Sequence, residues 1–348
     1  MKNLTIANSI TISDAMKALN RTAENCLLVV DENNVLLGTL TDGDLRRSIL
    51  AGAKFSAQIT ESFNTNPTFL VKGSYTKEEA MQLLRRKKLG LIPIVDKEHV
   101  VVDYIIWSAM NGGSKPSKTL RNVPVVIMAG GKGTRLEPFT KVLPKPLVPV
   151  REKPIIEHII KCFTDIGCTD FHMTVNYKSK ILKAYFEELH PDYQVHFVEE
   201  KEPLGTAGSL RFLDDQFKQS FFVTNCDIVI KADYVSLYEF HFKGGYDITL
   251  VASAKEYVIP YGTCELNGEG HLSHINEKPK YDFLINTGLY VLNPDVLELI
   301  PENKFYHITH LIEDAKNKGK KVGVFPIDDD AWIDVGQWTE YQQVVTKL

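Results

Sequence analysis

The stretch VVIMAGGKGTRLEPFTKVLPKPL, residues 125–147, begins as an apolar run and continues into glycines, cations and prolines. Its first residues have the β-branched and apolar character of a buried strand. The glycines that follow leave backbone N–H groups accessible, and basic side chains stand beside them. This composition is unsuited to a hydrophobic core and suited to binding an anion. We therefore interpret it as a strand followed by a phosphate-binding loop.

The bulk composition is that of an ordinary globular protein. The 348 residues are enough for two domains, and 44% of them are hydrophobic. A net charge of −4 gives no general attraction to nucleic acid or to an anionic membrane, so an anion site must be local. Five cysteines without a CxxC pair argue against a disulfide framework and against a zinc knuckle. Because the sequence shows no signal-peptide pattern and no long apolar run, we expect a cytoplasmic protein without a membrane span.

The first part of the chain contains a weak internal repeat with an offset of 65 residues, seen for example in Val30 and Val95. Each copy has the pattern of a helix, a strand, an Asp-led turn and a second strand. We expect the copies to occupy about 1–58 and 59–112. They predict a small α+β domain built from two similar halves.

Beyond the repeat, apolar strands alternate with amphipathic helices over residues 123–348. This pattern predicts an α/β domain with a Rossmann-like mixed, mostly parallel sheet. Residues 113–122, rich in Gly, Ser, Lys and Pro, are interpreted as the linker. The glycine-rich loop then follows the first strand, at the sheet edge where open α/β sheets bind ligands. Strands are expected at 123–129, 171–176, 195–200, 220–227, 247–253, 284–292 and 321–327.

Two familiar phosphate loops do not match these residues. A dinucleotide fingerprint starting at Gly131 requires a glycine where Leu136 stands. A Walker A loop requires Ser or Thr where Gly133 follows Lys132. On the glycines alone, a flexible surface turn with incidental cations is an equal alternative.

Later segments decide between these interpretations. They follow the loop in a fixed order: GGKGTRL (130–136), PKPL (144–147), PLGTAGSL (203–210), NCD (225–227), YG (261–262), EKP (277–279), NTGLYV (286–291) and WIDVG (332–336). Together they resemble the sugar-1-phosphate nucleotidylyltransferase (sugar-nucleotide pyrophosphorylase) family over roughly 123–348. The resemblance implies that a sugar-1-phosphate attacks the α-phosphorus of a nucleoside triphosphate, giving a nucleotide-sugar and pyrophosphate.

Such a reaction needs positioning and charge neutralisation rather than a protein nucleophile, because the incoming phosphate is already ionised. Arg135 offers a planar donor fork for phosphates. Lys145, held between two prolines, resembles the lysine that the family places at the reacting phosphates. The nucleotide-binding candidates in the loop are Gly130, Gly131, Lys132, Gly133 and Thr134.

Two aspartates are candidates for binding Mg²⁺. Asp227 ends an apolar run, which places it at the carboxyl edge of a strand, and Asp334 stands among apolar residues next to a glycine. Two carboxylates brought together provide the oxygen ligands that Mg²⁺ prefers. The resemblance implies that both are the metal ligands. The alternative for a strand-end aspartate is to cap a neighbouring helix.

The resemblance places Gly205, Thr206 and Ala207 near the nucleobase. Just upstream, Glu200 or Glu202 can accept hydrogen bonds from both N1–H and the amino group of guanine, which favours GTP. Equally, both can be solvated acidic residues.

For the sugar phosphate, the resemblance implies contacts from Glu277 and Lys278 of EKP and from Asn286 of NTG. Gly262 would let the backbone approach the sugar ring.

The two amino-terminal repeats resemble a CBS-domain pair (Bateman module), a module that often binds adenine nucleotides. The first copy carries GTLTDGD, in which Thr41 and Asp44 match the positions that face phosphate and ribose. The second copy lacks both features, so we expect at most one nucleotide site. A purely structural or dimerising module, giving a homodimer, is the alternative.

The pairing of these two modules is similar to that of the glucosamine-1-phosphate guanylyltransferases of nonulosonic (legionaminic) acid biosynthesis. We therefore expect a Mg²⁺-dependent enzyme that uses GTP and glucosamine-1-phosphate in bacterial surface-glycan synthesis. A thymidylyl-, cytidylyl- or uridylyltransferase would share the same catalytic motifs. A glycosyltransferase would normally show Asp-x-Asp, where this chain has Asn225-Cys226-Asp227. A nucleotide sensor with an inactive transferase domain is the alternative from another functional class.

Overall fold

The computed structural model describes residues 3–22, 24–87, 89–107, 120–336, 338 and 340–342. The chain forms two compact units. One contains residues 1–117, 254–285 and 328–330, and the other contains residues 118–253, 286–327 and 331–348. Residues 113–119 of the expected linker lie outside the described residues.

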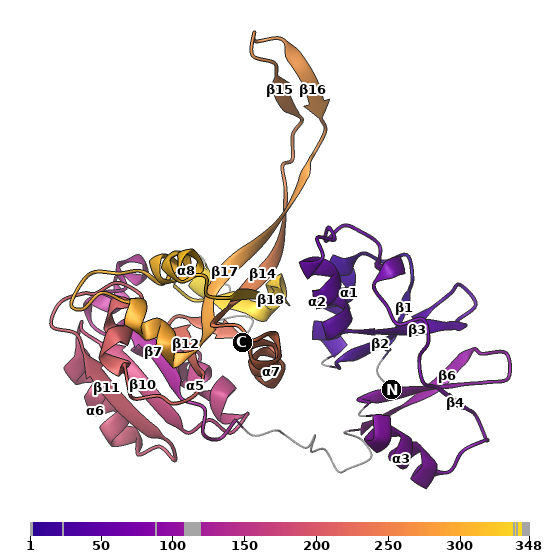
Figure 1. The fold of residues 1–348 in the computed structure, drawn as a ribbon, viewed down its shortest axis with the longest axis horizontal. Coiled ribbons are helices and arrows are strands. Elements are labelled where there is room, and N and C mark those ends of the chain that lie inside the picture. Colours follow the sequence, from indigo (N-terminus) through magenta and orange to yellow (C-terminus); the bar gives the residue numbers. More distant parts are fainter. Residues whose placement is uncertain are drawn as a thin grey trace. The chain divides into compact units, whose positions relative to one another are not determined.

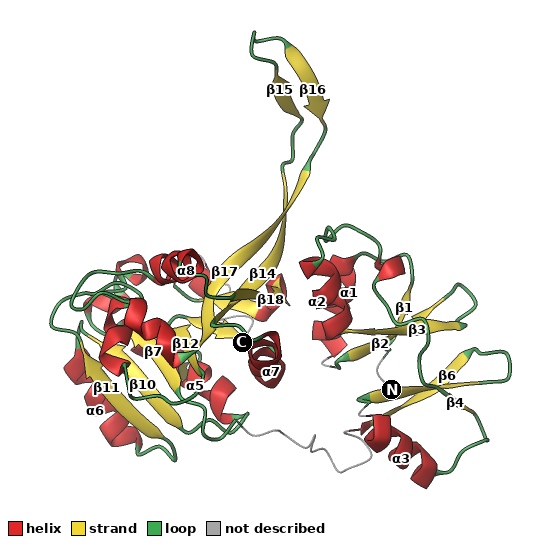
Figure 2. Ribbon diagram, viewed as in Figure 1, coloured by secondary structure: helices red, strands yellow, loops and turns green. Residues whose placement is uncertain are grey.

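The amino-terminal part contains two small three-stranded sheets, each flanked by helices (Figures 1 and 2). The first half comprises β1 (Thr5–Ala7), α1 (Ile12–Thr22), β2 (Cys26–Val30), β3 (Leu36–Thr41) and α2 (Asp42–Leu50). The second comprises the short helix η1 (Ile59–Glu61), β4 (Leu70–Val71), α3 (Lys77–Lys87), β5 (Leu91–Val95) and β6 (Val101–Ile106). In each sheet the middle strand pairs parallel with the first strand and antiparallel with the third.

The two halves also match in detail. Asp31 and Asp96 each accept backbone N–H bonds at the same place in the turn between two strands. The halves exchange backbone hydrogen bonds in a symmetric way, from Leu36 N–H to the carbonyl of His99 (3.0 Å) and from Val101 N–H to the carbonyl of Asn34 (2.9 Å). These two bonds are related by the 65-residue offset of the sequence pattern. The module therefore has an approximate internal two-fold arrangement.

The carboxyl-terminal unit is built on a seven-stranded sheet of order β11-β10-β7-β12-β17-β14-β18. The four strands from β11 to β12 run parallel, and β17 pairs antiparallel with β12. The mixed, mostly parallel α/β fold is therefore confirmed, and each expected strand corresponds to one of these seven. Their bounds are β7 (Val125–Ala129), β10 (Asp170–Val175), β11 (Gln194–Glu199), β12 (Phe221–Asn225), β14 (Ile248–Val258), β17 (Lys280–Leu292) and β18 (Val322–Asp328).

Helices cover both faces of this sheet, because alternate strand residues point to opposite sides and both sets are apolar. On one face pack α5 (Ile155–Thr164), α6 (Ser179–Leu189) and α7 (Tyr234–Gly244). On the other pack α8 (Ile308–Asn317) and two 3₁₀ turns, η5 (Gly208–Leu213) and η6 (Pro294–Leu299), where the alternating pattern favours amphipathic helices. Within the described part of the chain, none of the helices is long and apolar enough to span a membrane.

Three further strand pairs were not expected from the sequence. β13 (Ile228–Ile230) pairs antiparallel with β19 (Trp332–Asp334), just beyond the sheet edge at which β12 ends. β14 and β17 are connected by a hairpin whose tip is β15 (Thr263–Leu266) and β16 (Leu272–Asn276) (Figure 1). The short pair β8 (Pro149–Val150) and β9 (Lys153–Pro154) precedes α5. The β13–β19 pair matters most for the site described next.

Candidate functional site

The glycine-rich loop leaves β7 at Gly130 and folds back on the Lys145 segment. Gly133 has a φ of 68°, in the left-handed region that favours glycine. Its carbonyl accepts a hydrogen bond of 2.9 Å from the Thr140 hydroxyl. A Cβ at Gly133 would lie 2.9 Å from Thr140 Cγ2 and 3.0 Å from Lys145 Cβ. Glycine is therefore required here for the loop to pack against the segment that carries Lys145.

Glu200 lies on the other side of the same loop, at the end of β11. It is only 7% exposed, whereas Glu202 is exposed, so the solvated interpretation fails for Glu200. Its Oε2 accepts a hydrogen bond of 3.2 Å from Leu204 N–H. A Cβ added to Gly130 would lie 2.7 Å from Glu200 Oε1. The structure thus places one buried carboxylate directly beside the first glycine of the loop.

Lys145 and Asp227 form an ion pair between the lysine Nζ and the aspartate Oδ2. Lys145 begins η4 (Lys145–Leu147), and Asp227 follows β12 at the carboxyl edge of the sheet. Both side chains are 11% exposed, so their charges are screened less than those of a surface pair. The structure therefore brings the predicted catalytic lysine to one of the predicted metal ligands.

Asp334 reaches the same place through the unexpected strand pair. Ile228 and Asp334 are direct partners in the β13–β19 ladder, and Val335 N–H donates to the carbonyl of Asp227 at 2.8 Å. A Cβ on Gly336 would collide with Asp227 Oδ2 and would lie 2.9 Å from Asp334 Oδ1. Both carboxylates therefore face one small space, which exists because residue 336 has no side chain.

Neighbouring groups act on the pKa of Asp334 in opposite directions. Burial is the main cause that raises the pKa of Asp334, and the neighbouring Asp227 raises it further. The hydrogen bond from Gly336 N–H and the charges of Lys145 and Arg135 act in the opposite direction. Arg135, on the exposed turn η2 (Thr134–Leu136), is therefore close enough to act on Asp334. Two oxygen-donor carboxylates that face the same space provide the type of ligand that suits a Mg²⁺ ion.

Residues 205–207, which are predicted to lie near the nucleobase, pack against and hydrogen-bond to the residues at the start of α8. Gly205, with a φ of 80°, lies against the Tyr306 backbone, where a Cβ would be 2.7 Å from the carbonyl oxygen. The Thr206 hydroxyl accepts a hydrogen bond of 3.0 Å from Ile308 N–H, at the start of α8. Ala207 is fully buried, and its N–H donates to the Tyr306 carbonyl at 2.9 Å. Ala207 thus supports this segment from inside the core, and the position of all three residues near the nucleobase stays a prediction.

The sugar-side candidates fall into two groups. Gly262 and Glu277 lie on opposite legs of the hairpin, where a Cβ on Gly262 would be 2.9 Å from Glu277 Oε2. Lys278 is exposed beside them with a φ of 47°. These three residues belong to the unit that includes 254–285, whereas Asn286 belongs to the sheet unit. The Asn286 amide donates to the Tyr290 hydroxyl at 2.8 Å.

In the amino-terminal module, the predicted nucleotide contacts form a capping box at the start of α2. Asp44 N–H donates to the Thr41 hydroxyl at 3.2 Å, and Thr41 N–H donates to Asp44 Oδ2 at 2.8 Å. Two helix-end donors are satisfied in this way without a ligand. Gly38 has a separate role, because a Cβ there would collide with the Asn64 carbonyl.

Two features of the sheet unit are not predicted from the sequence. Gly336 belongs to the WIDVG motif, but its role in leaving room for both carboxylates depends on the β13–β19 pairing. A cluster of Asp170, His172 and His196 on β10 and β11 was also missed. Its only sequence signal is an Asp-x-His spacing and a histidine at the same position of the next expected strand.

Comparisons with known proteins agree with this geometry. A family model described as "Nucleotidyl transferase" matches residues 124–348, and one described as "CBS domain" matches residues 1–51. A mannose-1-phosphate guanyltransferase of Pichia angusta is 36% identical over 222 residues, covering 61% of this chain and 60% of that protein. The mannose-1-phosphate guanyltransferase of Saccharomyces cerevisiae is 35% identical, with 61% of each chain covered. The chain thus spans about three fifths of the length of these curated relatives.

Among solved structures, HddC from Yersinia pseudotuberculosis is similar, with a TM-score of 0.52 and 26% identity, covering 65% of this chain and 99% of that one. A second structure of HddC, described as complexed with GMP-PN, has the same TM-score and 25% identity. The nucleotidyl transferase match extends over more than half of the chain and includes the loop, Lys145 and both aspartates. The chain belongs to the nucleotidyl transferase family and carries a CBS domain at its amino end.

Proposed function

We propose that this chain is a sugar-1-phosphate guanylyltransferase, which transfers GMP from GTP to a sugar-1-phosphate and releases pyrophosphate. The observation that carries the proposal is the meeting of Lys145, Asp227 and Asp334 beside the glycine-rich loop. A lysine can neutralise phosphate charge directly, and two carboxylates that face one space can hold a divalent cation beside the phosphates. The family membership and the names of the relatives support the same reaction class.

In the proposed reaction, an oxygen of the sugar phosphate attacks the α-phosphorus of GTP. The new phosphorus–oxygen bond forms as the bond between the α-phosphorus and the bridging oxygen to the β-phosphate breaks, and pyrophosphate leaves. The attacking oxygen is already ionised, so no general base has to remove a proton. Lys145 would stabilise the charge that develops on the phosphate oxygens, and Arg135 would hold the triphosphate from the exposed side of the loop.

Asp227 and Asp334 would hold Mg²⁺ at the space next to Gly336. When bound there, the ion would supply positive charge beside the phosphates and help orient them. The ion pair with Lys145 already positions Asp227, and the β13–β19 ladder already positions Asp334. Little rearrangement of the two carboxylates would therefore accompany metal binding.

For the nucleobase, we propose that Glu200 selects guanine. It is buried beside Gly130, and its carboxylate can accept from both N1–H and the amino group of guanine. The guanyltransferase relatives, and the HddC structure described as complexed with GMP-PN, support this choice. Thymine and uracil would offer this carboxylate only one imide N–H.

Two sugar-1-phosphates are candidates for the acceptor substrate. The pairing of the two modules favours glucosamine-1-phosphate, for nonulosonic acid or surface-glycan synthesis, and the names of the relatives favour mannose-1-phosphate. The experiment measures pyrophosphate release with Mg²⁺ from GTP, ATP, UTP, dTTP and CTP, each with both sugar phosphates. We expect GTP with glucosamine-1-phosphate to give the highest kcat/KM. Release with no combination would overturn the enzyme proposal in favour of a nucleotide sensor.

We also propose a cytoplasmic location and a homodimer that is formed through the amino-terminal module. All five cysteines are free thiols, which suits a reducing compartment. An adenine nucleotide would bind at the first copy, where Thr41 and Asp44 stand at the start of α2. Thermal shift with ADP and ATP, repeated with Thr41→Ala, tests the nucleotide site, and light scattering tests the dimer. No shift with either nucleotide would leave a purely structural module.

A further inference from the structure

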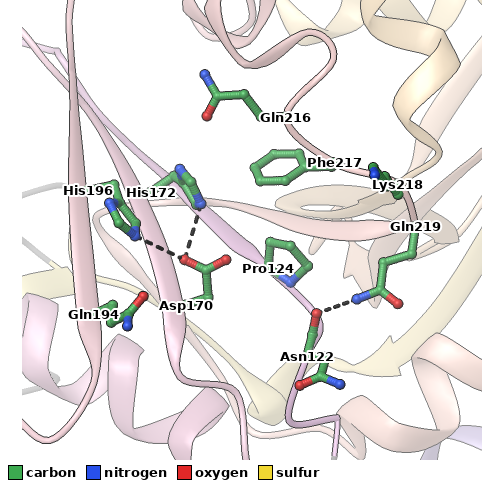
Figure 3. Close-up of a pocket in the computed structure, with 10 residues that line it drawn as sticks. All are labelled: Asn122, Pro124, Asp170, His172, Gln194, His196, Gln216, Phe217, Lys218 and Gln219. Atoms are coloured by element: carbon green, nitrogen blue, oxygen red, sulfur yellow. Dashed lines mark hydrogen bonds and ion pairs between the residues drawn. The ribbon is translucent and has the colours of Figure 1, made fainter.

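A second polar cluster lies at the amino ends of the sheet strands, on the opposite edge from Lys145, Asp227 and Asp334. Asp170 and His172 lie on β10, and His196 lies on β11 (Figure 3). The strands are parallel neighbours, and His172 and His196 are direct partners in the ladder. Because side chains alternate along a strand, Asp170 and His172 share a face, and the register places His196 beside them.

The three side chains converge on one point. Asp170 Oδ1 lies 3.2 Å from His172 Nε2 and 3.4 Å from His196 Nε2. The imidazole rings stack with centroids 4.9 Å apart and planes at 30°. One ligand atom from each residue lies within 4.8 Å of the other two. A cation at the centre would need only small side-chain rotations to reach all three.

The cluster contains buried polar atoms without hydrogen-bond partners. His172 is 8% exposed, and neither of its ring nitrogens has a hydrogen-bond partner in the described part of the chain. Asp170 Oδ1 is likewise without an aligned donor, although both histidines are close to it. Burying such groups unsatisfied is costly, and native proteins seldom leave them so.

A pocket of about 450 Å³ opens beside the cluster. Gln194, Gln216 and Lys218 line it together with the cluster residues (Figure 3). A fourth ligand, either water or a small anion attracted by Lys218, can therefore reach a cation that is held by the three side chains. Phe217 closes one side, with its ring centroid 4.9 Å from that of His172.

We propose that Asp170, His172 and His196 form a binding site for a transition-metal cation of the zinc class, separate from the Mg²⁺ site at the other edge. Two imidazole nitrogens and one carboxylate are a donor set that suits Zn²⁺ and its neighbours, whereas Mg²⁺ prefers oxygen ligands. Three protein ligands with an open fourth position match the usual coordination of a non-structural zinc site.

The site has a defined connection to the rest of the fold. β10 and β11 carry the ligands at their amino ends, and at their carboxyl ends they lead to Asn176 and Glu200. The Asn176 amide donates to the Glu200 carbonyl at 2.8 Å, and Glu200 lies beside Gly130. Metal binding would fix the two strands at the end remote from the loop, so its first expected effect is on stability.

The test uses untagged, full-length protein that has been stripped with a chelator and titrated with ZnCl₂ against a chromophoric competitor. We expect one zinc per chain and a rise in the melting temperature. His196→Gln and Asp170→Asn should each weaken zinc binding by at least about 10-fold, since removing a direct ligand costs at least as much as disturbing an outer-shell partner. The His196 side chain is half exposed, so His196→Gln is expected to fold normally, which circular dichroism checks.

Two matched variants complete the design. His274→Gln changes another exposed strand histidine and should bind zinc as the wild type does. Asp227→Asn should also keep its zinc, because it alters only the other edge. The proposal would be overturned if the wild type binds no zinc, or if His196→Gln and Asp170→Asn bind zinc as tightly as the wild type does. Loss of zinc binding in Asp227→Asn alone would also overturn it.

Discussion

At the carboxyl edge of the seven-stranded sheet, Lys145, Asp227 and Asp334 come from three segments that are far apart in the sequence. At the amino edge, Asp170, His172 and His196 come from two neighbouring strands. In the carboxyl-edge cluster, the ammonium group of Lys145 pairs with one carboxylate. In the amino-edge cluster, two imidazoles approach one carboxylate. The same sheet therefore presents carboxylate oxygens at one edge and a donor set rich in imidazole nitrogens at the other.

This difference shows how each kind of site depends on the fold. The carboxyl-edge site needs the β13–β19 pair, the turn at Gly336 and the packing of Gly133 on Lys145, so it exists only when the whole unit has folded. The amino-edge site needs only the register of two parallel strands. The two clusters should consequently respond independently to substitution, and a double-mutant comparison can test that independence.

The largest expected effect follows from Asp334→Asn. The substitution keeps the shape of the side chain and removes one of the two carboxylates that face Gly336. We expect kcat for pyrophosphate release to fall by about 10²–10³-fold, the size typical of losing one group that stabilises transition-state charge. Zinc affinity at the amino edge should stay unchanged. Wild-type turnover in Asp334→Asn would show that this aspartate does not serve the reaction, and a change in zinc affinity would contradict the independence of the two edges.

A smaller effect is expected from Gly130→Ala. The new methyl group would lie 2.7 Å from the buried carboxylate of Glu200 and would displace either that side chain or the loop. We expect kcat/KM for GTP to fall about 10-fold, equivalent to about 1.4 kcal/mol of transition-state binding.

Gly131→Ala provides the matched comparison, because nothing lies within 4 Å of a Cβ at that position. Its loss of kcat/KM should be clearly smaller than that of Gly130→Ala. Equal losses would mean that general stiffening of the loop, rather than the contact with Glu200, limits the reaction.

Much of the fold could be predicted from the sequence because its signal is local. Each of the seven strands contains a segment rich in apolar residues, and the alternation with helices predicts the sheet type. The two segments that became 3₁₀ turns, 208–213 and 294–299, are short, so apolar spacing alone could not separate an α-helix from a tighter turn.

The sites were predictable to different degrees. Asp227 was found because it ends an apolar run, and family resemblance identified Asp334. The reason that these two meet, the pairing of Ile228 with Asp334, is a long-range contact that no local pattern encodes. His172 was hidden for the same reason: a histidine inside an apolar strand looks like a core residue until the register sets His196 beside it.

The smallest expected effect concerns His241, a buried histidine with full hydrogen bonding. Its Nδ1 lies 2.9 Å from the Thr249 hydroxyl and its Nε2 lies 3.0 Å from Asn293 Oδ1, whereas the nitrogens of His172 have no hydrogen-bond partner in the described part of the chain. Burial is the main cause that lowers the pKa of His241 below its usual value of 6.5. The unfolded chain therefore binds more protons than the folded one between the lowered pKa and 6.5.

It follows that the stability contributed by neutral His241 is fully present above pH 6.5 and is lost as the pH falls through its folded-state pKa. Urea unfolding between pH 5 and pH 8 measures this as a falling free energy of unfolding at the acid end. His241→Gln can still donate and accept but does not titrate, so its stability should depend less on pH. Zinc added to the wild type should leave the His241 contribution unchanged. An identical pH dependence in wild type and His241→Gln would place the acid sensitivity elsewhere, and would remove the contrast drawn between a satisfied and an unsatisfied buried imidazole.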